Sequence, residues 1–198
     1  MTFRIVIPVR PLTEGKTRLA PALKPPDRAA LAEAMFRHVL SVALATVPAG
    51  DCVVVSRSDA VLDIAAEAGA SAMREAGFEL NDALTQAVMS LSADAPVLAL
   101  FADLPLLTVA DLAAMTAALD EADIVAASDW AGTGTNALLL RQPALILYRF
   151  GADSLSRHRA EATACGLRFA VVQRPGLSSD LDRPADLAML AGSDVSAA

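Results

Sequence analysis

Cysteine, histidine and aromatic residues are scarce in this chain of 198 residues, and long apolar runs are missing from it. The two cysteines, Cys52 and Cys165, are too few and too far apart for a disulfide framework or a zinc site. The longest apolar stretch, around 97–101, falls well short of the roughly 20 residues that a membrane span needs. The sequence therefore predicts a soluble protein whose cysteines are reduced and structural.

Positive charge is scarce as well, because 16 Lys and Arg residues face 23 Asp and Glu residues. The net charge of -7 argues against general binding to nucleic acid. The exception is residues 1–28, which carry a local charge of +4: Arg4, Arg10, Lys16, Arg18, Lys24 and Arg28 against Glu14 and Asp27. Prolines between positions 8 and 26 disfavour a long helix there. We therefore expect these cations on a loop that attracts an anionic ligand.

Short apolar runs alternate with longer segments of helical periodicity, a pattern typical of an α/β fold with a mostly parallel sheet. Strands are predicted at 3–9, 52–56, 97–101, 124–127, 137–140 and 167–172, and helices at 27–47, 59–68, 79–91, 108–120 and 153–165. Asp27 is expected to cap the first helix, and Gly166 to end the last. We expect one domain over 1–190 and a frayed tail over 191–198.

Two acidic motifs follow apolar runs and suggest a metal-dependent enzyme. Asp103 ends a predicted strand, at the edge of a parallel sheet where α/β proteins bind ligands. Asp180 and Asp182 lie far along the chain, and their spacing of two places both carboxylates on one side of an extended segment. Carboxylates are the ligands that Mg²⁺ prefers. Alone, Asp103 is equally well explained as a turn or cap residue, and Asp186 is better explained as a first-turn residue after Pro184.

The segment Gly15, Lys16, Thr17 matches the end of a phosphate-binding P-loop, but the full motif fails. That motif requires a glycine at the position of Arg10, within a glycine-rich stretch that this chain lacks. Lys16 and Arg18 are instead predicted to contact a triphosphate directly, unless the loop is simply solvated.

Six ordered blocks together resemble one family, the phospholactate guanylyltransferases of coenzyme F420 biosynthesis. The blocks are PVRPL (8–12), GKTRLAP (15–21), DLPLL (103–107), GTNAL (134–138), FGADS (150–154) with His158, and DLDRPADL (180–187). They span nearly the whole chain. The resemblance implies a three-layer nucleotidyltransferase fold, GT-A-like and Rossmann-like, shared with molybdenum-cofactor and sugar-nucleotide enzymes.

The resemblance also implies an activity: transfer of GMP from GTP to a three-carbon phosphoacid, with release of pyrophosphate. The acceptor is left open among 2-phospho-L-lactate, phosphoenolpyruvate and 3-phospho-D-glycerate, which differ by a few atoms. The attacking phosphate is already largely ionised at neutral pH, since its second pKa is about 6. No strong general base is therefore required, and Mg²⁺ or Mn²⁺ is the implied cofactor.

Residue roles follow from the matching blocks. Lys16, Arg18 and Asp103 are the implied catalytic residues; Pro8, Val9, Lys16, Arg18 and Asn81 bind the nucleotide; Thr135, Asn136, Gly151, Ser154 and His158 bind the phosphoacid; Asp103, Asp182 and, as an alternate, Asp180 bind the metal. Simpler roles compete at several positions: Ser154 as an N-cap, Asn81 as a helix-start residue, and His158 as a residue that orders the loop. His38 is expected to be partly exposed without a catalytic role.

Two rival functions remain at this stage. A molybdenum-cofactor-type nucleotidyltransferase should open with a glycine-rich loop after the first strand, where this chain has PVRPL. A non-catalytic GTP-binding protein on the same fold would not need its acidic motifs. The first residues lack the apolar core of an export signal, so we expect a cytoplasmic location. The predicted partners are GTP and a small phosphorylated carboxylic acid, with no nucleic acid and no membrane, and a homodimer is left open.

Overall fold

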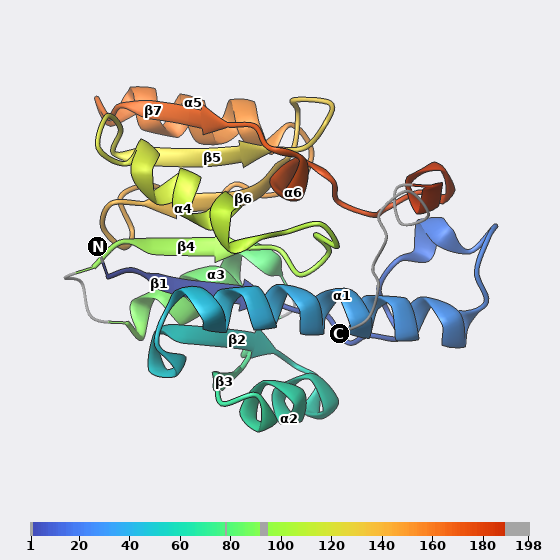
Figure 1. Cartoon of the computed structure of the whole chain (residues 1–198). Coiled ribbons are helices and arrows are strands. Elements are labelled where there is room, and N and C mark those ends of the chain that lie inside the picture. Colours follow the sequence, from blue (N-terminus) through green and yellow to red (C-terminus); the bar gives the residue numbers. More distant parts are fainter. Residues whose placement is uncertain (1, 78, 92–94, 189–198) are drawn as a thin grey trace.

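The computed structural model describes residues 2–77, 79–91 and 95–188. Within these residues, seven strands form one sheet in the order β3-β2-β1-β4-β6-β5-β7 (Figure 1). The strands are β1 (Arg4–Pro8), β2 (Cys52–Ser56), β3 (Ser71–Arg74), β4 (Val97–Leu100), β5 (Ile124–Ser128), β6 (Thr135–Leu140) and β7 (Phe169–Val172). Neighbouring strands are parallel except β6, which is antiparallel to β4 and β5. The predicted α/β fold with a mostly parallel sheet is confirmed.

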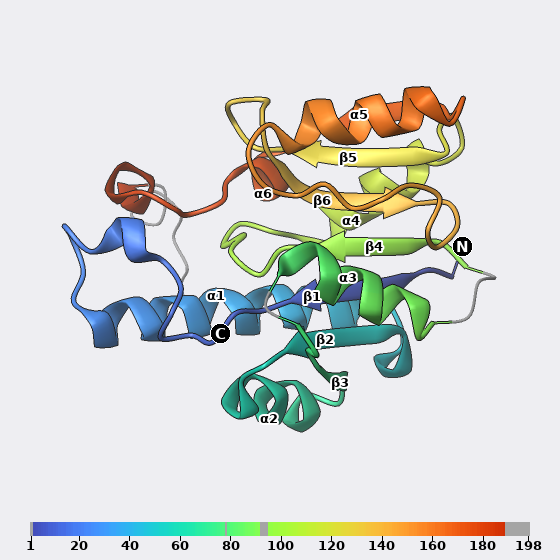
Figure 2. The same cartoon turned by 180° about the vertical axis from the view of Figure 1, so that it is seen from behind.

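Helices cover both faces of this sheet. The helices are α1 (Pro25–Thr46), α2 (Asp59–Glu67), α3 (Leu80–Met89), α4 (Val109–Ala118), α5 (Ser154–Ala164) and the short α6 (Pro175–Ser178), with 3₁₀ turns η1 (Thr17–Leu19), η2 (Ala49–Asp51) and η3 (Pro184–Asp186). Buried side chains of α1, α2 and α4 share one apolar layer, and those of α3 and α5 share the other. Figure 1 views the molecule from the α1 side and Figure 2 from the α3 and α5 side.

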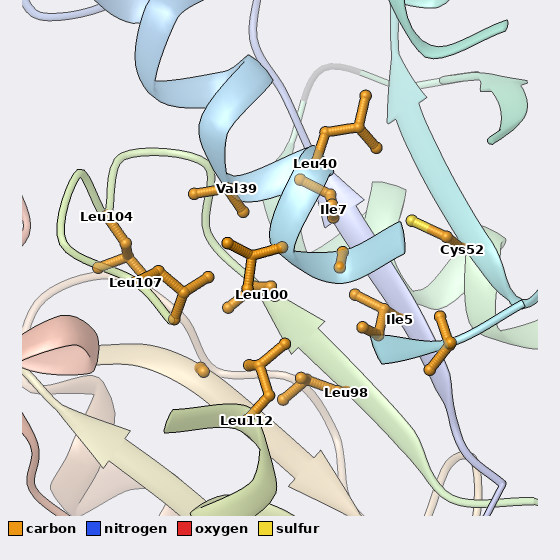
Figure 3. Packing of buried hydrophobic residues seen from close by; sticks show 14 of the residues in the cluster. Ile5, Ile7, Val39, Leu40, Cys52, Leu98, Leu100, Leu104, Leu107 and Leu112 are labelled. Carbon is orange, nitrogen blue, oxygen red and sulfur yellow. The ribbon is translucent and has the colours of Figure 1, made fainter. Parts of the chain in front are cut away.

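Alternation along the strands produces these two layers. Ile5 and Ile7 of β1 belong to the α1 layer, whereas Val6 between them belongs to the α3 layer. Side chains of successive strand residues point to opposite faces, so an unbroken apolar strand can serve two cores. In Figure 3, Val39 and Leu40 of α1 lie over the face of the sheet that carries Ile7 and Leu100. The sheet is therefore packed on both faces, and it supports the loops at its edge.

The start of α1 corrects one expectation. The helix begins at Pro25 rather than Asp27, with Lys24 as the N-cap residue, so Asp27 lies in the first turn and does not cap it. Proline suits the first helical position because its missing N–H would have no partner there. By length and composition α1 could cross a membrane. Its buried residues, which include Phe36 and Val39, pack on the sheet as in a core helix.

Two strands depart from the sequence expectation. β3 was not predicted, because three of its four residues are exposed and it has no apolar run. β6 begins at Thr135 rather than Ala137, and its antiparallel direction brings that first residue to the edge where β4 ends. Gly166 does follow the end of α5, with a φ of 68°, as predicted. The tail expected over 191–198 lies outside the described residues, and the single domain over 1–190 stays a prediction.

Candidate active site at the ends of the central strands

A cavity of about 410 Å³ opens where β1 and β4 end. The loop after β1, the first half of α1, the start of α3 and the loop after β4 supply its walls. The lining residues are Pro8, Val9, Arg10, Pro11, Leu12, Glu14, Gly15, Lys16, Thr17, Arg18, Ala32, Met35, Phe36, Leu80, Phe101, Ala102, Asp103 and Asp182. Apolar and charged side chains therefore both line the cavity. A cavity of this kind suits a small molecule that has both apolar and charged parts.

Lys16 connects the two acidic motifs. Its Nζ lies 2.6 Å from Oδ2 of Asp103 and 3.5 Å from Oδ1 of Asp182, and its side chain is only 8% exposed. Arg18 Nη1 lies 2.6 Å from the other oxygen of Asp182. Lys16 also has a positive φ of 55°, an uncommon conformation for a residue with a side chain, and it precedes the 3₁₀ turn η1. Strain of this kind persists only where the surroundings fix the residue.

The C-terminal segment reaches the cavity through backbone and apolar contacts. Leu181 N–H donates to the carbonyl of Asp103 over 3.2 Å, and the Leu181 side chain is buried against Leu19 and Met35. Asp186, the residue expected in a first helical turn, lies in η3 and accepts from the N–H groups of Asp182 and Arg183. Asp182 is therefore held beside Asp103, although 78 residues separate them in sequence.

Charge in the cavity wall is balanced: Arg10, Lys16 and Arg18 face Glu14, Asp103 and Asp182. Among the described residues, no group of three or more His, Cys, Asp or Glu side chains is arranged to hold a metal ion. The Oδ1 atom of Asp103, however, is buried without a hydrogen-bond partner in the described part of the chain. A buried carboxylate oxygen without a donor is destabilising unless a cation or donor meets it. This oxygen and the oxygen-rich donor set around it fit a hard divalent cation.

Asp180 precedes Leu181 in the sequence, and Asp182 follows it. Asn136 Nδ2 donates to Asp180 Oδ1 over 3.0 Å and to the carbonyl of Leu177 over 3.0 Å. Burial raises the pKa of Asp180, and the nearby Asp103 carboxylate acts in the same direction, against the hydrogen bond from Asn136. The hydrogen bond from Asn136 thus ties the segment that carries Asp180 and Asp182 to β6. In the described residues Asp180 does not line the cavity, unlike Asp182.

A second polar cluster lies behind this edge of the sheet. Thr135 Oγ1 lies 3.1 Å from Ser154 Oγ and 3.2 Å from His158 Nδ1, and all three side chains are buried. The N–H of Arg149 donates to His158 Nε2 over 3.0 Å. Burial lowers the pKa of His158 to about 4, with a smaller contribution from Arg157. Both ring nitrogens of His158 are therefore occupied inside the protein.

The loop before α5 is attached to α3. Asn81 Nδ2 donates to the carbonyl of Phe150 over 3.2 Å, and its Oδ1 accepts from the N–H of Phe150 over 2.9 Å. Gly151 follows with a φ of 125°, a conformation that side chains rarely adopt. Asn81 lies in the first turn of α3, so its helix-start role is observed and its nucleotide-binding role stays a prediction. His38 is partly exposed and its Nε2 donates to the carbonyl of Leu107, as a structural residue would.

The structure thus brings together Pro8, Val9, Lys16, Arg18, Asp103 and Asp182 in one cavity wall. It holds Thr135, Asn136, Ser154 and His158 in buried contacts outside that wall, at the neighbouring strand end. Sequence reasoning expected Arg10 among the cations of the first loop without giving it a specific role, and it missed the apolar wall from Met35, Phe36, Leu80 and Phe101. These four residues lie in visible apolar patterns, but such patterns do not distinguish core positions from those that border a cavity.

The three-layer architecture is an α/β fold that this chain shares with a solved structure described as a nucleotide-diphospho-sugar transferase. The structure of a candidate nucleotide-diphospho-sugar transferase from Desulfovibrio desulfuricans G20 superposes with a TM-score of 0.77, covering 99% of this chain and 90% of that chain at 18% identity. A family model described as "Guanylyl transferase CofC like" matches residues 3–198. The chain therefore belongs to the CofC-like guanylyltransferase family, as its motifs indicated.

Curated relatives span almost the same length. The phosphoenolpyruvate guanylyltransferase of Sphaerobacter thermophilus is 39% identical over 195 residues, covering 97% of this chain and 94% of the relative. The phosphoenolpyruvate guanylyltransferase of Rubrobacter xylanophilus is 41% identical over 205 residues, covering 98% and 95%. The chain is thus a guanylyltransferase enzyme, which removes the non-catalytic and molybdenum-cofactor alternatives as leading interpretations.

Proposed function

We propose that this protein transfers the GMP unit of GTP to the phosphate of phosphoenolpyruvate, as a step of coenzyme F420 biosynthesis. A phosphate oxygen of phosphoenolpyruvate bonds to the α-phosphorus of GTP, and the bond from that phosphorus to the bridging oxygen of the β-phosphate breaks. The electron pair leaves with pyrophosphate. The observation that carries the choice of acceptor is the near-full-length similarity to two relatives that bear this name.

Charge neutralisation is the main demand of this reaction. The attacking phosphate is already largely ionised, since its second pKa is about 6, so proton removal contributes little. Two anions must be aligned, and charge must be stabilised at the α-phosphate and on the leaving pyrophosphate. We assign this work to Lys16 as a point charge and Arg18 as a planar fork, both in the cavity wall. Arg10, which lines the same wall, adds a third cation.

A divalent metal, Mg²⁺ or Mn²⁺, completes the proposal. Asp103 and Asp182 would hold it, with Asp180 as the alternate ligand, because the Asp103 Oδ1 atom has no other partner in the described residues. The ion supplies Lewis-acid polarisation of the phosphoryl oxygens. The balanced cavity wall supports the same assignment, since three cations against three carboxylates give no net attraction for a triphosphate.

The remaining predicted residues receive the two substrates. The apolar side of the cavity, beside Pro8 and Val9, accommodates the base and ribose of GTP, with Asn81 as a further contact. Thr135, Asn136, Gly151 and Ser154 receive the phosphoacid at the start of β6 and of α5. A helix N-terminus favours an anion through its free N–H groups. Both substrates are small molecules of the cytoplasm, where we expect this protein.

The test is pyrophosphate release by the purified protein with Mg²⁺ and GTP. Phosphoenolpyruvate, 2-phospho-L-lactate and 3-phospho-D-glycerate are added separately, and ATP and CTP replace GTP as controls. Release that depends on phosphoenolpyruvate supports the proposal, and release with another acid renames the acceptor. GTP binding without release under any condition would contradict it. Omitting the divalent ion tests the metal assignment in the same assay.

A further inference from the structure

The protonation state of His158 is fixed by its neighbours. A backbone N–H can only donate a hydrogen bond, and the N–H of Arg149 points at His158 Nε2 over 3.0 Å. That nitrogen must therefore carry a lone pair, which leaves the ring proton on Nδ1. The Arg149 side chain is held over 2.8 Å by Glu161, which lies in the same helix as His158. The His158 and Phe150 rings meet edge to face, with 4.8 Å between their centroids. The ring is held in place from both sides.

This tautomer decides the hydrogen-bond count in the cluster. His158 Nδ1–H donates to Thr135 Oγ1 over 3.2 Å, and Thr135 Oγ1 is paired with Ser154 Oγ over 3.1 Å. The two hydroxyl groups own two hydrogens, and one of them is used in the bond between them. One hydroxyl hydrogen is then left to donate outward. If Nδ1 were the acceptor instead, the ring would take that hydrogen and none would be left.

We propose that His158 is a positioning residue, which acts through Thr135 to keep the Thr135 and Ser154 hydroxyl pair a hydrogen-bond donor toward the phosphoacid. The proposal rests on the acceptor site proposed above. Thr135 and Ser154 are each only 2% exposed, so water competes little for the remaining hydrogen. A buried donor without a partner is destabilising, and a bound anion relieves that cost. Thr135 is followed by Asn136, which donates to Asp180, so the donor lies at the same strand end as the carboxylates.

The first test is the tautomer itself, read from imidazole ¹⁵N chemical shifts at pH 7. The chain has two histidines, so the spectrum of His38→Gln assigns the His158 signals. We expect Nδ1 protonated and Nε2 unprotonated. The opposite tautomer, or a charged ring, would overturn the proposal whatever the enzyme activity proves to be.

The second test is a double-mutant cycle on the KM for the acceptor acid. His158→Gln should raise that KM about tenfold, the scale of one hydrogen bond to a charged group, while the KM for GTP changes less than twofold. In a Thr135→Val background the same substitution should change the acceptor KM less than about twofold, since the hydroxyl through which it acts is gone. His158→Asn, whose amide nitrogen can occupy the Nδ1 position, should recover part of the loss.

Two outcomes would assign His158 a merely structural role. One is that His158→Gln raises the acceptor KM equally in the wild-type and Thr135→Val backgrounds; the other is that it changes the KM for GTP as much as the KM for the acceptor. Thermal midpoints of all variants, measured beside the kinetics, show whether each one folds. If phosphoenolpyruvate gives no turnover with the wild type, the acceptor assignment fails on its own. The cycle is then run with whichever acid is used, and the tautomer measurement stands independently of turnover.

Discussion

Gly176 should not tolerate even a methyl group, although its backbone angles are open to any residue. A Cβ atom at this position would lie 2.1 Å from Oδ2 of Asp111 and 2.6 Å from the carbonyl oxygen of Leu106. Neither can yield easily. Asp111 is buried and forms a capping box with Thr108, and its Oδ1 lies 2.6 Å from Nε of Arg174. Overpacking costs about 1–3 kcal/mol, and a disturbed N-cap costs about 1 kcal/mol more.

Gly176→Ala is therefore expected to lower the free energy of unfolding by about 2–4 kcal/mol. For a domain of this size that corresponds to a fall in Tm of about 4–16 °C. Thermal and urea unfolding measure it, and Gly50→Ala is the matched control. Gly50 is exposed, and an added Cβ there would meet nothing within 4 Å. If the two variants unfold at the same temperature, the contact between α6 and the Asp103 to Asp111 segment is looser than the structure has it.

Three further predictions concern the site. Asp103→Asn should lower pyrophosphate release by about 100-fold or more while its circular dichroism spectrum stays native, and wild-type turnover would refute the catalytic assignment. Lys16→Met should raise the KM for GTP by about tenfold, whereas Lys24→Met, an exposed cation outside the cavity wall, should not. The pKa of His158 is about 4 in the folded protein against 6.5 as its ordinary value, so the unfolded chain binds this proton first as the pH falls. The free energy of unfolding should therefore drop by about 3 kcal/mol between pH 7 and pH 4, and His158→Gln should show a smaller drop in urea titrations.

Much of the fold was predictable because its central strands are strongly apolar. β1, β2 and β4 are buried on both faces, and such strands produce continuous apolar runs in the sequence. β3 gives no such signal, since its residues are mostly exposed and it is recruited by pairing with β2. The direction of β6 was also invisible, because an apolar run specifies burial but not orientation. That direction nevertheless places Thr135 and Asn136 at the edge of the sheet where β4 ends, before Asp103.

The candidate site was predictable to the extent that its residues lie in motifs. Lys16, Asp103 and Asp182 were chosen for their chemistry, and the structure joins them within 3.5 Å. The contact that joins them, Leu181 N–H to the Asp103 carbonyl, uses backbone atoms, which carry no side-chain signature. Nor does the sequence show which candidate site residues line the cavity and which are buried outside its wall. Thr135 and His158 were predicted to bind the phosphoacid and Lys16 to bind the nucleotide, yet only Lys16 lines the cavity, whereas Thr135 and His158 lie in a buried cluster outside its wall.

This separation in depth has a chemical reason. In the function that we propose, the cations and carboxylates of the cavity wall meet a highly charged triphosphate, and partial exposure lets the two carboxylates exchange partners: the Asp103 and Asp182 side chains are 27% and 35% exposed. Recognition of one small acid among close analogues depends instead on hydrogen bonds whose direction is fixed, and burial fixes it by excluding water. A neutral histidine suits that second task, because it orients hydroxyl groups without adding charge. The same sheet edge thus carries a partly exposed charged cluster and a buried polar one, to which we assign the two substrates.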